Sequence, residues 1–142
     1  MKKLKIKFPN YDFIPVFWMA SEDHDFKEIN HINIFNNHLS VDGEDSVAVG
    51  TLDPSIFDSV LNELQLIFKN DNRYHELDTI FLNALKKPNW SQATRYWISK
   101  LFSKDDLLIF DANDKDLKKL FYESFLSEVN DQFIYNSVVD TN

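Results

Sequence analysis

The residues in this sequence with the clearest capacity for chemistry follow one another directly: Glu22, Asp23, His24 and Asp25. A carboxylate beside an imidazole favours its protonated form and fixes its tautomer, which suits a proton shuttle. The carboxylates can also bind an amine or act on it as a general base. A structural explanation stays open beside this one. Acids in the first turn of a helix match its dipole, and a histidine in a turn can be satisfied by local hydrogen bonds.

The segment before this cluster predicts the element that positions it. Residues 13–19, FIPVFWM, are apolar apart from Pro15, and polar residues follow abruptly. A short apolar run of this kind is typical of a buried parallel strand, and open α/β sheets bind ligands just past the carboxyl ends of such strands. A second buried strand is predicted at 107–110 and is closed by Asp111, which becomes a site candidate by the same rule. Ser21 is predicted to cap a short helical turn.

The remaining elements follow from apolar spacing. Helices are predicted at 55–70, at 74–85, from a Ser91 cap to 102, and from Asp114 to 129 with an aromatic core stripe of Phe121, Tyr122 and Phe125. Residues 28–52 indicate a small β insert with a turn at Asn36-Asn37 and a further short strand at 47–52. Residues 1–7 fit either an edge strand or the end of a helix. Strands joined by helical crossovers predict an α/β fold.

Composition limits the classes of protein to which the chain can belong. With 142 residues and 44% hydrophobic residues, it is long and apolar enough for one globular core. A net charge of −8 argues against nucleic-acid and anionic-membrane partners. Two glycines exclude a Gly-rich phosphate loop, and the absence of cysteine excludes disulfides and thiolate nucleophiles. No apolar run reaches the roughly 20 residues of a membrane span. We predict a cytoplasmic protein.

The histidines raise the question of a metal site. His24, His31 and His38 recur every seven residues, and neighbouring acids such as Glu28 could add ligands. Zinc ligands on one helix usually lie four residues apart, however, and the Asn36-Asn37 pair interrupts any helix through this segment. The sequence therefore predicts scattered histidines and no metal site.

Residues 15–31, PVFWMASEDHDFKEINH, resemble the signature of the cysteine-adding enzymes of bacillithiol biosynthesis. That family adds L-cysteine to glucosaminyl malate in the last step of bacillithiol synthesis. Residues 90–121, WSQATRYWISKLFSKDDLLIFDANDKDLKKLF, resemble a later segment of the same family. The resemblance implies a single partial Rossmann-like domain over 1–142, with parallel strands, helical crossovers and a helical connective segment at about 54–103. It also favours a helix at residues 1–7.

The resemblance implies roles for the site residues. It favours catalysis by His24 with Asp23, Asp25 and Glu22. The candidates for substrate binding are Ser21, Trp18, Glu28, Asn30 and His31. Each has a structural alternative: a strand tryptophan is often part of the core, and Asn30 and His31 can satisfy backbone groups at a bend.

Family members are much longer than this chain. The Gly-Gln-Gln-type loop that opens the family's core and the coiled coil through which it homodimerises are not found in this sequence. We therefore expect an internal or N-terminally truncated fragment of the ligase that does not ligate cysteine alone. The alternative is a non-catalytic small-molecule-binding or interaction module. The cofactor stays open: a nucleotide is one candidate, and no metal is expected.

Overall fold

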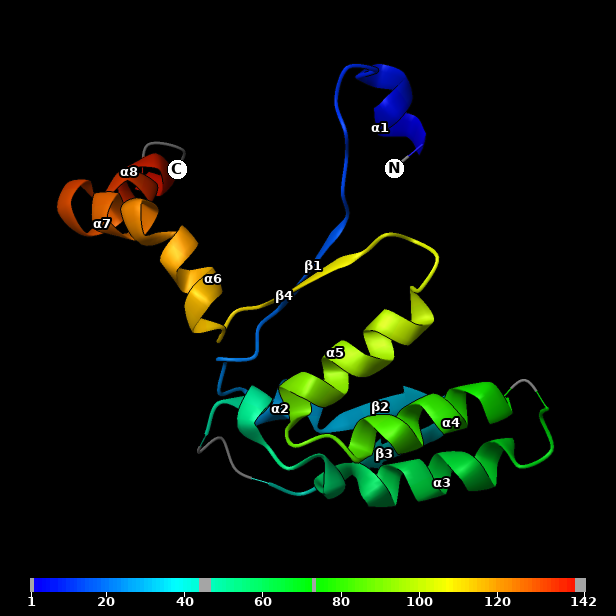
Figure 1. The fold of residues 1–142 in the computed structure, drawn as a ribbon. Coiled ribbons are helices and arrows are strands. Elements are labelled where there is room, and N and C mark those ends of the chain that lie inside the picture. The colour runs from blue at the N-terminus through cyan, green and yellow to red at the C-terminus, as the bar shows by residue number, and fades with distance from the viewer. Residues whose placement is uncertain (1, 44–46, 73, 140–142) are drawn as a thin grey trace.

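The computed structural model describes residues 2–43, 47–72 and 74–139. Two strands, β1 (Val16–Met19) and β4 (Leu108–Asp111), form a parallel sheet near its centre (Figure 1). Met19 lies opposite Asp111 in the register, so the carboxyl ends of both strands are side by side. The predicted parallel pair and the α/β class are confirmed.

A small hairpin follows the first strand. Helix α2 (Phe26–Ile29) leads into β2 (His31–Ile34), which pairs antiparallel with β3 (Asn37–Ser40). This confirms most of the predicted β insert. The turn lies at residues 35–36, one residue before the predicted Asn36-Asn37 turn, and Phe35 adopts the left-handed conformation with φ of 52°.

The strand predicted at 47–52 is wrong, because part of this segment is a short 3-10 helix, η1 (Val49–Thr51). The N–H of Val49 donates to the carbonyl of Asp23 at 2.7 Å, and that of Gly50 donates to the carbonyl of Ser21 at 2.8 Å. The segment thus binds the backbone just after β1 instead of pairing with a strand. A Cβ on Gly50 would lie 2.6 Å from both the Cβ and the carbonyl oxygen of Ser21, so only glycine fits without movement.

The helical segment begins at Asp53, whose side chain accepts a hydrogen bond from the Ser55 N–H at 2.9 Å. The 3-10 helix η2 (Pro54–Phe57) continues into α3 (Asp58–Phe68), and α4 (Tyr74–Leu85) and α5 (Trp90–Leu101) follow. The helices predicted at 55–70 and 74–85 are confirmed. Ser91 does not cap the third: Asn89 does, accepting from the Gln92 N–H at 2.9 Å, while the Ser91 side chain is used elsewhere.

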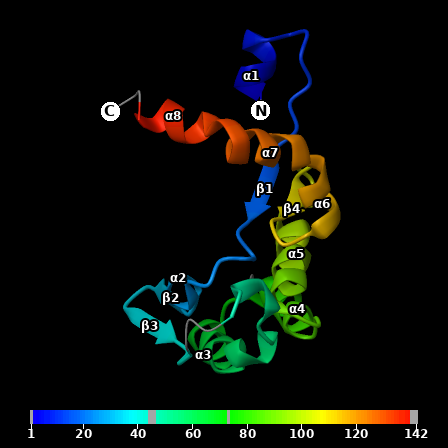
Figure 2. The ribbon, with the colours of Figure 1, turned by 90° about the vertical axis from the view of Figure 1, so that its left-hand side faces the viewer.

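The main core lies between the hairpin and helices α3 to α5 (Figure 2). Its buried centre consists of Phe26, Val41 and Phe57, and the Phe57 and Trp90 rings lie 4.2 Å apart. The parallel sheet is less covered than predicted. Met19 is buried, but Trp18 is 53% exposed. The prediction that this strand is buried is therefore wrong, and the alternative that Trp18 belongs to the core does not hold. The sheet has only two strands among the described residues, which leaves its outer edges open.

The chain ends lie on the sheet's side of the molecule (Figure 1). Residues 2–7 form α1 (Lys2–Lys7), as the resemblance favoured. Asp114 caps α6 (Lys115–Leu120), and α7 (Tyr122–Asp131) and α8 (Phe133–Val139) follow. The predicted continuous helix from 114 to 129 is therefore broken at Phe121. The aromatic stripe of Phe121, Tyr122 and Phe125 is exposed and not core, and α7 contains no buried residue.

Within the described ranges, no helix has the length and apolar character that crossing a membrane requires.

Candidate functional site

Asp111, the last residue of β4, connects three elements at the carboxyl edge of the sheet. Its Oδ1 accepts a hydrogen bond from the Ser21 hydroxyl, just past β1, and its Oδ2 accepts one from the Ser91 hydroxyl, in the first turn of α5. The backbone N–H of Asn113 donates to Asp111 Oδ1 at 3.0 Å and to Ser21 Oγ at 3.2 Å. We call Ser21, Ser91, Asp111 and the Asn113 N–H the Asp111 cluster.

The electrostatics of this cluster favour the ionised form of Asp111. Burial raises the pKa of its carboxyl group, but hydrogen bonds from Ser21, Ser91 and Asn113 and the positive charge of Arg95 together hold that pKa below its usual value. The Arg95 guanidinium also donates to the Ile109 carbonyl at 3.3 Å. A carboxylate with a lowered pKa and both oxygens occupied is a poor general base. Asp111 is therefore a positioning residue that holds the strand ends against α5.

A cavity of about 170 Å³, called the smaller cavity below, lies beside the Asp111 cluster. It is bounded by the end of β1, by η1 and by the first turn of α5, and its lining includes Trp18, Ser21, Gly50, Ser91 and Thr94. Of the predicted site residues, Ser21 and Trp18 line it. Ser21 is buried and does not cap a helical turn as predicted, because its hydroxyl donates to Asp111.

The acidic segment, residues 22–25, follows Ser21 and is exposed. Glu22 forms an ion pair with Lys118 of α6. The Asp23 carboxylate accepts a hydrogen bond from the His24 N–H at 2.7 Å, a local turn contact. Asp25 occupies the N-cap position of α2 without a capping bond from its side chain. None of these residues lines either cavity, so the acidic segment stands beside the smaller cavity and not inside it.

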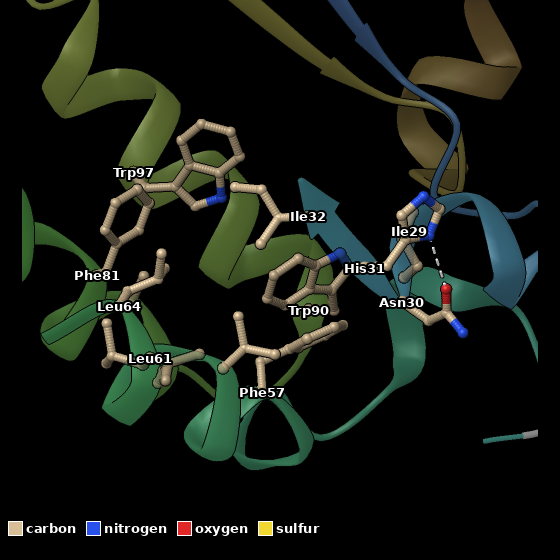
Figure 3. A pocket seen from close by; sticks show the side chains of 13 residues that line it. Ile29, Asn30, His31, Ile32, Phe57, Leu61, Leu64, Phe81, Trp90 and Trp97 are labelled. Carbon is tan, nitrogen blue, oxygen red and sulfur yellow. Dashed lines mark hydrogen bonds between the residues drawn. The ribbon is translucent and has the colours of Figure 1, made fainter. Parts of the chain in front are cut away.

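A larger cavity of about 370 Å³ lies between the hairpin and the helices (Figure 3). Its lining is mostly apolar and comprises Ile29, Asn30, His31, Ile32, Phe57, Val60, Leu61, Leu64, Phe81, Ala84, Leu85, Trp90 and Trp97. Asn30 donates through Nδ2 to the Val41 carbonyl at 3.3 Å, and its Oδ1 lies 3.0 Å from His31 Nδ1. Asn30 therefore satisfies a backbone carbonyl, as its structural alternative describes, and it also lines this cavity.

The structure therefore separates the predicted residues into two places. Trp18 and Ser21 lie at the smaller cavity, and Asn30 and His31 lie at the larger one. Ile29 and Trp90 line both cavities and separate them. Glu28 is exposed on α2. Across the described residues, no three histidine or acidic side chains gather in a group that could hold a metal ion.

Sequence reasoning missed Ser91 as a member of the site. Its position at a helix start favoured a capping role, but α5 begins at Trp90, two residues earlier than a Ser91 cap requires. The hydrogen bond that places Ser91 in the site joins it to Asp111, 20 positions later in the sequence. This bond depends on the pairing of β4 with β1, which the local sequence does not specify.

The sequence is similar to a known protein family over its whole length. The family model described as "Bacillithiol biosynthesis BshC, N-terminal Rossmann-like domain" matches residues 1–142. A Flavobacterium johnsoniae protein named "Putative cysteine ligase BshC" is 36% identical over 141 residues, which cover 99% of this chain and 27% of that protein. Proteins of the same name from Christiangramia forsetii and Staphylococcus saprophyticus are 34% and 30% identical, over 99% and 78% of this chain and 27% and 23% of their own lengths.

The chain thus spans about a quarter of the length of these curated relatives. Its parallel strands, its helices and the full-length match to the family model agree with one another. The chain belongs to the family of BshC N-terminal Rossmann-like domains.

Proposed function

We propose that this chain is the Rossmann-like part of an enzyme that joins L-cysteine to glucosaminyl malate through an amide bond. The observation that carries the proposal is the Asp111 cluster, which builds a small cavity at the carboxyl ends of two parallel strands with an acidic segment beside it. That is the edge at which α/β sheets bind ligands. The names of the relatives support a cysteine ligase, and the second substrate is the one that the sequence resemblance implies.

Amide formation places two demands on the residues of such a site. The amine must lose a proton before its nitrogen can attack the carboxyl carbon, and the bond from that carbon to its leaving oxygen must break. In the proposal, Asp23 and Asp25 bind the ammonium form of the amine, and His24 accepts the proton that frees its lone pair. The amine then attacks the carbon of an activated carboxyl group, and the leaving oxygen departs with its activating group and takes the second proton of the nitrogen. Glu22 has a separate role, because its pairing with Lys118 fixes the acidic segment to α6.

The proposed binding residues follow the two cavities. The indole of Trp18 is half-exposed and lies at the edge of the smaller cavity, where it can pack against the face of a sugar ring. Ser21 fixes the cavity wall through Asp111. Glu28, Asn30 and His31 are proposed for a second binding area. They follow the acidic segment directly in α2 and β2, and two of them line the larger cavity.

A chimera tests this function most directly. This chain replaces the region of the Flavobacterium johnsoniae relative that it matches, and ligation of cysteine to glucosaminyl malate is followed by mass spectrometry. We expect product from the chimera and none from the 142-residue chain alone. We expect His24→Ala and Asp25→Ala to reduce the chimera's kcat by about 10²-fold or more. His75→Gln, on the exposed surface of α4, is the matched control and should leave the rate unchanged.

A folded chimera without activity beside an active relative would contradict the proposal, as would His24→Ala and Asp25→Ala variants with full activity. The competing function is a non-catalytic binding module, for which the apolar larger cavity is the supporting observation. Calorimetry separates the two: a module would bind glucosaminyl malate without turnover, and His24→Ala would not change its affinity. The nucleotide cofactor, the coiled-coil dimer and the cytoplasmic location stay predictions that belong to the whole enzyme.

A further inference from the structure

Two histidine side chains lie next to each other on one face of the hairpin. In the β2–β3 register His38 stands opposite Asn33, and Asn33 is two residues after His31 on the same strand. Residues two apart on a strand share a face, so His31 and His38 are diagonal neighbours. Both side chains are exposed, and their ring centres are 5.2 Å apart with planes tilted by 34°.

The tautomer of both rings follows from their partners. His31 Nδ1 lies 3.0 Å from Asn30 Oδ1, and His38 Nδ1 lies 2.7 Å from Asn33 Oδ1. An amide oxygen can only accept, so each Nδ1 carries the hydrogen in the neutral ring. The Nε2 atom of each ring therefore keeps its lone pair. A histidine whose Nδ1–H is held by an oxygen while Nε2 is available is the arrangement found in metal-ligating histidines.

The separation of the rings also suits a shared ion. A bond of about 2.0–2.1 Å from metal to imidazole nitrogen places the metal about 3.2 Å from the ring centre. Two rings on one tetrahedral ion then have centres roughly 5 Å apart, which is the separation that the structure shows.

We infer that His31 and His38 form a two-histidine site for a borderline divalent transition-metal ion such as Zn²⁺, Cu²⁺ or Ni²⁺. Imidazole is a preferred ligand of these ions, and hard cations such as Mg²⁺ and Ca²⁺ favour oxygen ligands instead. The remaining coordination positions stay open to water or to an oxygen or sulfur donor from outside. Because His31 also lines the larger cavity, the ion would lie at the border of that cavity. The inference shares His31 with the proposed second binding area, but metal binding is measured without the ligase reaction, so either proposal can fail alone.

The site is tested with the metals alone on the 142-residue chain. Zn²⁺ is titrated by calorimetry, and one equivalent of Cu²⁺ is examined by electron paramagnetic resonance. We expect one Zn²⁺ per chain, a Cu²⁺ spectrum with two imidazole nitrogens, and no heat with Mg²⁺. His31→Gln and His38→Gln should each weaken Zn²⁺ binding at least about tenfold, and Asn33→Ala, which releases Nδ1, should weaken it about tenfold. Far-UV circular dichroism should be unchanged in each variant.

The control is His75→Gln, which removes an exposed histidine on α4, outside the hairpin, and should bind as the unchanged chain does. An equal loss of Zn²⁺ affinity in His75→Gln and His31→Gln would overturn the site, because any exposed histidine would then account for the binding. Absence of Zn²⁺ binding, or a Cu²⁺ spectrum with fewer than two imidazole nitrogens, would overturn it as well. The Cu²⁺ spectrum of the unchanged chain decides the matter even if a variant does not fold.

Discussion

At the scale of single residues, Asp111 has the most distinctive environment in the described chain. Both carboxylate oxygens accept from serine hydroxyls, and those serines are themselves buried. A hydrogen bond to a charged group contributes about 1.5–3 kcal/mol to stability, and a buried donor without an acceptor is costly. The stability of the sheet edge should therefore depend on this one side chain.

The first prediction is that Asp111→Asn lowers the free energy of unfolding by about 1–3 kcal/mol, measured by urea denaturation. Asparagine keeps the shape but offers only one acceptor oxygen to two hydroxyl donors. Asp116→Asn is the matched control, because Asp116 is exposed on α6 and pairs only with the nearby Lys119. It should change the free energy by less than about 0.5 kcal/mol. Equal changes in the two variants would contradict this account.

Asp111 should also make stability depend on pH. Its pKa in the folded chain is below the ordinary aspartate value of 3.8, so its ionised form favours the folded state. The contribution is complete above about pH 4 and is lost as the pH falls through the lowered pKa. Melting temperatures measured between about pH 6 and pH 2.5 should fall less steeply in Asp111→Asn than in the unchanged chain. Parallel curves would show that other carboxylates account for the dependence.

At the scale of elements, the contact between η1 and the end of β1 positions the smaller cavity.

The third prediction is that Gly50→Ala destabilises the chain by about 1–3 kcal/mol, because the added Cβ meets the Ser21 backbone and side chain and neither is free to move. Urea denaturation measures the change. Thr51→Ser, at the exposed next position of the same 3-10 helix, keeps its hydroxyl bond to the Ala48 carbonyl and should have an effect below about 0.5 kcal/mol. A neutral Gly50→Ala would contradict the close approach.

The elements that the sequence predicts well are those whose pattern is complete within a short window. Helix α4 begins and ends where its apolar spacing indicates, and the two parallel strands stand out as apolar runs closed by polar residues. Residues 47–52 have an equally strand-like pattern, but two of their N–H groups bind carbonyls that follow β1. That partner is a tertiary choice, which β propensity does not determine.

The candidate site could be predicted only in part for the same reason. Local motif and strand-end position indicated Ser21 and Asp111, and the structure brings these two together. The role of Ser91 depends on where α5 packs against the sheet. Asn30 and His31 are separated from Ser21 by the side chains of Ile29 and Trp90. No pattern in the sequence predicts where these two side chains lie.

At the scale of the whole molecule, burial is unevenly distributed. Helices α3 to α5 and the hairpin surround the main core, whereas α6 and α7 contain no buried residue. Large apolar side chains such as Leu120, Val129 and Tyr135 are more than half exposed. Local stability should follow this difference, because amides open at lower cost where few apolar contacts hold them.

The fourth prediction is that amide hydrogens of α7 exchange much faster than those of α5, with protection at least about tenfold lower. Hydrogen exchange of the 142-residue chain, read by mass spectrometry of peptides from 90–101 and 122–131, measures it. Helix α4 is the internal control and should resemble α5, since the two helices pack together in the described chain. Similar protection in α5 and α7 would contradict the difference in burial.

The parallel pairing of β1 with β4 has a consequence for the order in which the chain folds. Ser21 and Asp111 are 90 positions apart, whereas the hairpin and each helix close over short distances in sequence. Bringing distant segments together costs chain entropy that local contacts do not, and non-local pairings slow folding. The hairpin and helices α3 to α5 should therefore condense first. The carboxyl edge of the sheet, and the Asp111 cluster with it, would be assembled last and would be the first feature lost when the nascent chain misfolds.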